Sequence, residues 1–218
     1  MTAAKPTIAA NRGKPAAAQI ARDIVEQLEA GELSPGQRMV EADLCFRYGV
    51  GRQIIREALQ HLHALGVVAI EPNRGAHIVH VTRDEAVMTL ELTELLFGLV
   101  SRSAARRAAA GADAGRLSAA ITELEQSAIA NDPALYMRAR RHLFAALAQM
   151  AGNKELTRIM ELVRVHAMRA QFGFAAFRSG HAHELAEIGR TVRSGEAEDA
   201  EEMSRTYVRQ IRETLQQI

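Results

Sequence analysis

Arginine and glutamine side chains share one side of a helix that the sequence predicts over residues 52–65. At about 100° per residue, the apolar residues of this segment fall on one arc. The polar ones fall on the opposite arc: Arg52, Gln53, Arg56, Gln60 and His63. Arginine can bridge two acceptors of guanine, and glutamine can pair with adenine. The polar strip therefore suits the major groove of DNA, although a face that only contacts water has a similar composition.

The elements around this strip favour DNA binding. Apolar residues at four-residue spacing predict a first helix after Pro15. A loop and a short second helix over 41–48 follow, and this helix ends at Gly49, just before the strip. Two β-prone runs, "VVAI" and "AHIVHV", then flank the turn "EPNRG" and predict a two-stranded hairpin with Arg74 at its tip. Three helices followed by a hairpin predict a winged helix-turn-helix domain.

The rest of the chain shows only helical periodicity. Short segments with Gly, Pro or Asn interrupt it from Thr82 onward, which predicts about six helices. We therefore expect a mainly α protein with a small β-hairpin wing. Its predicted parts are a disordered tail at 1–14, a winged helix-turn-helix domain at 15–80 and an all-helical bundle at 81–218.

Composition narrows the class of protein. The chain has 218 residues, a formal net charge of +1 and 48% hydrophobic residues, as in a folded globular protein. A single cysteine, Cys45, excludes an internal disulfide framework and fits a reducing compartment. No apolar run is long enough to span a membrane. No Gly-rich phosphate loop, HExxH motif or nucleophile elbow is present. We expect a cytoplasmic protein that is not an enzyme and has no membrane partner.

Several motifs in one register carry a family resemblance. They are "G-x-L-x-P-G" at 31–36, "G-V-x-R" at 49–52 and "R-E-A-L" at 56–59. With the wing glycine, they closely resemble the DNA-binding domain of the GntR family of bacterial transcription regulators. The resemblance implies that Arg52, Gln53 and Arg56 contact DNA in the major groove. It also implies that Arg74 and Gly75 of the wing contact the minor groove, and that Arg38 supports a contact with the DNA backbone.

Two positions depart from the family pattern. Gly51 stands where Ser or Thr is usual, which weakens the cap of the recognition helix by a few tenths of a kcal/mol. Ile54 stands where Pro is frequent. Neither departure removes a group that would contact DNA.

The helical remainder resembles the FCD domain of the FadR-type subgroup. The resemblance rests on "FAALAQMAGNKEL" at 144–156 and "SGEAEDAEEM" at 194–203. Such domains are helical bundles with a central pocket, and many bind a metal ion through one Asp and three His. In this sequence the four ligand positions fall on Arg140, Phe144, Leu185 and Tyr207, and a frequent acidic position falls on Phe97. These groups bind zinc or manganese poorly, so we expect no metal and no other cofactor.

The central pocket has two interpretations without a metal. The five positions just named would form an apolar cavity with one cation, which suits a small amphipathic or carboxylate effector. Alternatively, their side chains fill the core and no effector binds. Histidines elsewhere leave a non-standard metal site open, although two of them, two residues apart, point to different sides of a helix. The histidines are His142, His166, His181 and His183.

The combination of a winged DNA-binding domain and a helical domain with a central pocket indicates a transcription regulator, most often a repressor. We expect it to bind double-stranded operator DNA of palindromic sequence as a homodimer, with an effector that biases its conformation. The alternative is a constitutive DNA-binding protein whose helical domain only dimerises.

Overall fold

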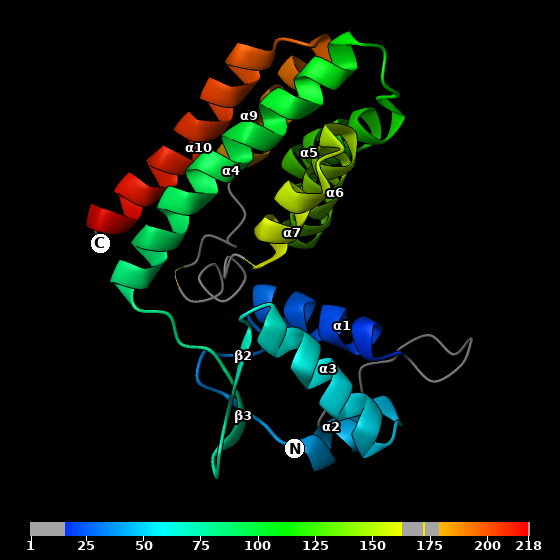
Figure 1. Cartoon of the computed structure of the whole chain (residues 1–218), viewed down its shortest axis with the longest axis vertical. Helices are drawn as coiled ribbons and strands as arrows, with labels where there is room; N and C mark the ends of the chain where they lie inside the picture. The colour runs from blue at the N-terminus through cyan, green and yellow to red at the C-terminus, as the bar shows by residue number, and fades with distance from the viewer. Residues whose placement is uncertain (1–15, 163–171, 173–178, 218) are drawn as a thin grey trace.

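The computed structural model of the chain describes residues 16–162, 172 and 179–217 (Figure 1). The tail predicted at 1–14 and His166 lie outside these residues. Figure 1 shows a smaller group of helices with a sheet, formed by the N-terminal part of the chain, next to a larger group of long helices. The prediction of a mainly α fold with a small β wing is confirmed.

The winged part contains a three-stranded antiparallel sheet in which β3 is central, between β1 and β2. The sequence predicted only the β2–β3 hairpin and placed Arg38 and Met39 in a loop, which was wrong. These two residues form β1 and pair with His77 and Ala76. Met39 is buried, and its burial draws the loop backbone onto the edge of β3. The elements are α1 (Ala17–Glu29), β1 (Arg38–Met39), α2 (Glu41–Tyr48), α3 (Arg52–Ala64), β2 (Val68–Glu71) and β3 (Gly75–Ile78).

A tight turn joins α2 to α3. Gly49 ends α2 with a φ of 65°, a left-handed conformation that glycine adopts without a Cβ penalty. Tyr48, the last residue of α2, donates a hydrogen bond of 2.5 Å to the Asp23 carboxylate on α1. Burial and Asp23 raise the pKa of Tyr48, so its hydroxyl stays protonated. This bond fixes α2, and therefore the start of α3, against α1.

Six further helices are described in the rest of the chain. Thr82 caps the first of them in a capping box: its side chain accepts from the Glu85 backbone at 3.3 Å, and the Glu85 carboxylate accepts from the Thr82 backbone at 2.8 Å. No helix in the described ranges is both long and apolar enough to cross a membrane. The helices are α4 (Arg83–Ala109), α5 (Gly115–Ala130), α6 (Pro133–Ala151), α7 (Lys154–Leu162), α9 (Ser179–Ser194) and α10 (Ala197–Gln217).

Helices α4 and α10 lie side by side over most of their length (Figure 1). Glu94 of α4, with a side chain only 8% exposed, is surrounded by arginines of α10. Its carboxylate lies 3.1 Å from Arg209 and 3.2 Å from Arg212. Farther along the pair, Ser204 donates a hydrogen bond of 2.7 Å to Ser101. These buried polar contacts set the register of the two helices, because an unpaired buried charge is costly.

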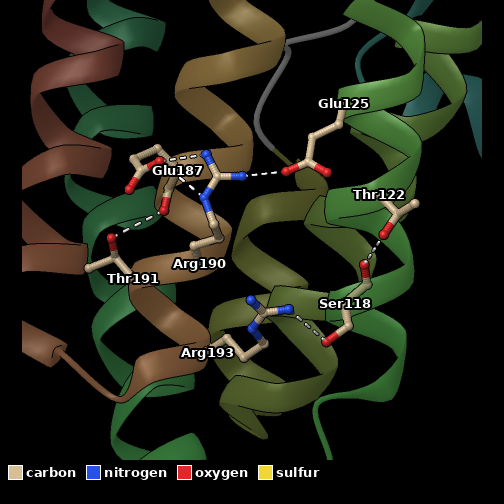
Figure 2. Close-up of polar contacts among 7 residues, drawn as sticks. All are labelled: Ser118, Thr122, Glu125, Glu187, Arg190, Thr191 and Arg193. Carbon is tan, nitrogen blue, oxygen red and sulfur yellow. Dashed lines mark hydrogen bonds and ion pairs between the residues drawn. The ribbon is translucent and has the colours of Figure 1, made fainter.

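Helix α9 lies against α5 on the other side of the core. Figure 2 shows an ion pair between Arg190 and Glu125 and a bond of 3.3 Å from Arg193 to the Ser118 hydroxyl. Gly189 permits the close approach, since a Cβ there would lie 2.8 Å from the Ile121 side chain. The apolar face of α9 is thereby held inside the bundle.

Candidate functional site

The two arcs of α3 are separated in the structure as the sequence predicts. Ile55, Leu59 and Leu62 are buried in the core that α3 shares with α1. Arg52, Gln53, Arg56 and Gln60 are all exposed on the opposite side. The core face anchors the helix, and the exposed face is free to contact a partner.

A groove of about 430 Å³ lies between α3 and the sheet. Arg56 and Gln60 line it from α3, and Arg38 and Gly75 line it from β1 and β3. A Cβ on Gly75 would lie 4.0 Å from the Arg38 guanidinium, and Gly75 has a φ of +76°. The structure therefore brings Arg38, Arg56 and Gly75, which are distant in sequence, to one groove.

The wing tip extends beyond this groove. Asn73 adopts a positive φ of 66° in the turn between β2 and β3, a conformation that asparagine tolerates better than most residues. The Arg74 side chain is 80% exposed and lies 3.3 Å from Glu71. An arginine at the end of a hairpin can reach a surface that the rest of the domain does not touch.

Two carboxylates bind side chains of the exposed α3 face. Arg56 donates from Nε to both oxygens of Glu41, at 3.1 and 3.2 Å. Gln53 donates to Glu57 at 3.0 Å. Arg52 has no ion pair with any described residue. A nucleic acid would therefore find Arg52 free, whereas Arg56 and Gln53 would exchange an internal partner for a base or a phosphate.

Sequence reasoning did not identify the pairing of Glu41 with Arg56. Glu41 was noted only as the residue that begins α2, and 15 positions separate it from Arg56. No periodicity links the two residues, because they lie on different helices. Gln60 was placed on the polar arc but not among the contact residues, and the structure sets it in the groove.

An aromatic cluster lies in the centre of the helical part. Phe97 of α4 and Phe144 of α6 have ring centroids 4.8 Å apart, and Tyr207 of α10 lies 6.3 Å from Phe97. Leu185 of α9 is fully buried in the same core. The Arg140 guanidinium stacks 4.6 Å from the centroid of the Phe144 ring. The predicted pocket residues thus come from four helices and gather around one centre.

Arg140 is the unusual member of this cluster. It is only 7% exposed, and no hydrogen bond or ion pair joins it to another residue of the described ranges. Arginine is almost never buried without a partner. A guanidinium stacked on an aromatic ring is partly stabilised by the cation–π interaction. Its hydrogen-bond donors can still bind a planar anion such as a carboxylate.

Two family models match this chain over most of its length. The model described as bacterial regulatory proteins of the gntR family matches residues 16–78, and the model of the FCD domain matches residues 89–210, more than half of the chain. The chain is a GntR-family transcription regulator with an FCD domain. Helix α3 lies within the region that matches the gntR model, and most of the helical bundle lies within the region that matches the FCD model.

Solved structures share the fold of this GntR-family regulator. A putative GntR transcriptional regulator from Rhodococcus sp. RHA1 is 22% identical, with a TM-score of 0.72 over 91% of this chain and 96% of that chain. E. coli McbR/YncC is 17% identical, with a TM-score of 0.74 over 92% of this chain and 97% of that chain. No curated protein sequence matches. These likenesses establish the fold and no finer property.

The FCD domain of this regulator does not present the metal ligands typical of such domains. The positions that the resemblance assigns to Asp and His carry Arg140, Phe144, Leu185 and Tyr207, and a stacked guanidinium repels a cation. Within the described residues, no group of three His, Cys, Asp or Glu side chains is placed to hold a metal ion. The side chains at these four positions do not offer the donors that zinc or manganese prefers.

The three described candidate histidines have different surroundings. His142 of α6 bonds to Glu123 of α5 at 2.6 Å. His181 of α9 has its ring 5.6 Å from the Tyr207 ring, and His183 is exposed. His181 therefore borders the aromatic cluster, which sequence reasoning did not identify.

Proposed function

We propose that this GntR-family regulator represses transcription by binding a palindromic operator as a homodimer, and that a small organic anion in its FCD domain lowers operator affinity. The observation that carries the DNA part is the groove between α3 and the sheet, where Arg38, Arg56 and Gly75 meet beside the exposed Arg52. In helix-turn-helix proteins the second helix reads base edges, and dimers match the symmetry of their half-sites. A protein with this role works on chromosomal DNA in the cytoplasm.

An exposed apolar stripe on α4 supports the homodimer. Met88, Leu92 and Leu95 are 65%, 45% and 54% exposed, and at about 100° per residue they lie within one narrow arc. The first turn of α4 is acidic and the last turn is basic. Two copies of α4 packed antiparallel about a twofold axis would cover both stripes.

The dimer has a direct test. Leu92→Glu together with Leu95→Glu should yield a monomer in sedimentation velocity, because two charges would be buried against two others. Ile129→Glu is the matched control, since Ile129 is 85% exposed on α5, away from the stripe. A double variant that sediments like the wild type would contradict the α4 interface.

Buried Arg140 supports an anionic effector. A carboxylate could accept hydrogen bonds from the guanidinium, which has no hydrogen bond to another described residue, and the rings of Phe97, Phe144 and Tyr207 would contact an apolar body. The ligand class is therefore a small carboxylate with an aromatic or aliphatic tail, bound without a metal.

A second candidate is a constitutive DNA-binding protein that has no effector. Phe97 and Leu185 are completely buried and Tyr207 nearly so, which favours a core already filled by its own side chains. Thermal melting with a panel of aromatic and medium-chain aliphatic carboxylates separates the two. Stabilisation of the wild type that is lost in Arg140→Gln supports the effector, and no stabilisation by any member supports the second candidate.

The DNA function is tested by selection from a random duplex pool. The wild-type protein should enrich an inverted repeat, and a footprint should cover both halves. Enrichment of no sequence, or binding that is equally strong to every duplex, would contradict an operator-specific regulator.

A further inference from the structure

Glu29 of α1 is buried although its position on the helix faces away from the winged core. At about 100° per residue, Glu29 lies opposite Ile20 and on the same side as the exposed Arg22 and Glu26. Its side chain is nevertheless only 1% exposed. A buried carboxylate is costly unless it is paired. Some element outside the winged core must therefore cover it and supply a positive charge.

Arg141 of α6 supplies that charge from the FCD domain. Its Nη2 lies 3.1 Å from Glu26 Oε1, and its Nη1 lies 3.6 Å from Glu29 Oε2. One guanidinium thus spans two carboxylates that are three residues apart on α1. Figure 1 shows α1 as the element of the winged part that faces α6 and α7. We name Arg141, Glu26 and Glu29 the Arg141 clasp.

The clasp joins the two domains where their described elements contact each other little. Among the described elements, no helix or strand of the winged part packs extensively on a helix of the FCD domain. The ion pair of Arg141 with Glu26 and Glu29 therefore joins two domains whose described elements pack little against each other.

The residue before the clasp arginine is Arg140, which stacks on Phe144 in the aromatic cluster. Two consecutive residues of one helix thus face the proposed effector site and the DNA-binding domain. A shift or rotation of α6 that improves the binding of an anion to Arg140 moves the Arg141 backbone with it, since the helix is internally hydrogen-bonded. The two sites share one rigid element that both can bias.

We infer that the Arg141 clasp holds the winged domain in the orientation that binds the full operator, and that an anion at Arg140 acts on DNA affinity by displacing Arg141. The second half of this inference rests on the proposed function. The first half, which concerns orientation, does not.

The orientation of the winged domain on the FCD domain can be measured without DNA or effector. In a Cys45→Ser background, spin labels at Glu32→Cys and Lys154→Cys report the distance between the two domains. An excess of unlabelled chain removes signals between protomers. Both sites are exposed. We expect a narrow distance distribution for the wild type and a broad one for Arg141→Gln. The control Arg138→Gln removes an exposed arginine from the same helix and should stay narrow. A narrow distribution in Arg141→Gln overturns the inference.

A second variant protects the test against misfolding. Arg141→Gln leaves Glu29 buried without this partner, whereas Glu29→Gln combined with Arg141→Gln removes both charges. The double variant should melt near the wild-type temperature and still give the broad distribution. If it gives the narrow distribution of the wild type, the clasp does not orient the domains.

Operator binding tests the functional half with the full-length protein. Arg141→Gln should weaken binding to the selected inverted repeat about three- to thirtyfold and leave binding to a single half-site unchanged, because one winged domain needs no fixed orientation. Equal weakening on both duplexes, or none on either, overturns this half. If the wild type selects no operator, the proposed function fails while the distance measurement still decides the clasp.

Discussion

The exposed arginines of α3 offer the sharpest test of operator recognition. Arg52 has no ion pair among the described residues, and Arg56 is held by Glu41 at 3.1 Å. An arginine that bridges guanine contributes about 1–3 kcal/mol of discrimination. A dimer carries each residue twice, so Arg52→Ala should cost about 2–6 kcal/mol, or about 30-fold to more than 10⁴-fold in Kd.

Arg56→Ala should differ from Arg52→Ala in a way that the structure predicts. Removing Arg56 also leaves the Glu41 carboxylate unpaired in the groove, where it repels phosphate. Adding Glu41→Gln to Arg56→Ala should therefore recover part of the loss, about 2- to 30-fold for an exposed pair that the dimer carries twice. The same Glu41→Gln change should not rescue Arg52→Ala, because the two side chains are not paired.

The assay is fluorescence anisotropy on the selected duplex, repeated over a salt series. Both variants should melt within about 1 °C of the wild type, since their side chains are exposed and surface changes have small effects on stability. Arg138→Ala on α6 is the control for a change of one charge far from DNA. Wild-type affinity, salt slope and footprint in both α3 variants would refute the assignment of α3 as the reading helix.

Three further changes test the elements that hold this site. Gly51→Ser should raise Tm by about 1 °C, because this N-cap of α3 has an extended backbone and no side-chain hydrogen bond, and no atom lies within 4 Å of a new Cβ. A lower Tm in calorimetry would contradict this. Tyr48→Phe should cost about 1–2 kcal/mol in urea unfolding, because Asp23 loses the Tyr48 donor and keeps the bond from the Gln27 side chain. An unchanged midpoint would count against the Tyr48 bond. Glu94→Gln should lower the free energy of unfolding by about 2–4 kcal/mol and Tm by about 5–12 °C, whereas Glu198→Gln, at an exposed position, should not. Equal Tm values for the two variants would show that the buried ion pairs of Glu94 do not stabilise the fold.

Local signals in the sequence are strong in the winged part. The separation of polar and apolar arcs on α3 follows from helical geometry alone, and the structure keeps it. Gly49 was predictable as the end of α2 because the next residues begin a new helix. In contrast, β1 is only two residues long and forms because Met39 is buried beside β3. Propensity could not predict it, since the cause is a contact with residues almost 40 positions away.

In the FCD domain, the sequence predicted which positions are related but not how their side chains pack. Resemblance placed Phe97, Phe144 and Tyr207 at related positions, and the structure brings their rings together. Whether such rings leave room for a ligand depends on rotamers and on packing from four helices, which no spacing encodes. The sequence could not predict the pairing of Glu29 with Arg141 either, because hydrophobic periodicity within a segment says nothing about contacts between two domains.

Two of the described connections between the winged domain and the FCD domain lie at separate points, and they bear on how a ligand could act. One point is covalent: β3 ends at Ile78 and α4 begins at Arg83, so the wing lies within a few residues of the helix that we propose as the dimer interface. The other point is the Arg141 clasp on α1. A single flexible attachment leaves a domain free to rotate, whereas a second attachment restricts that rotation. Loss of the clasp should therefore leave the dimer and each reading helix intact while the spacing between the two helices becomes variable, which weakens binding to two half-sites more than to one.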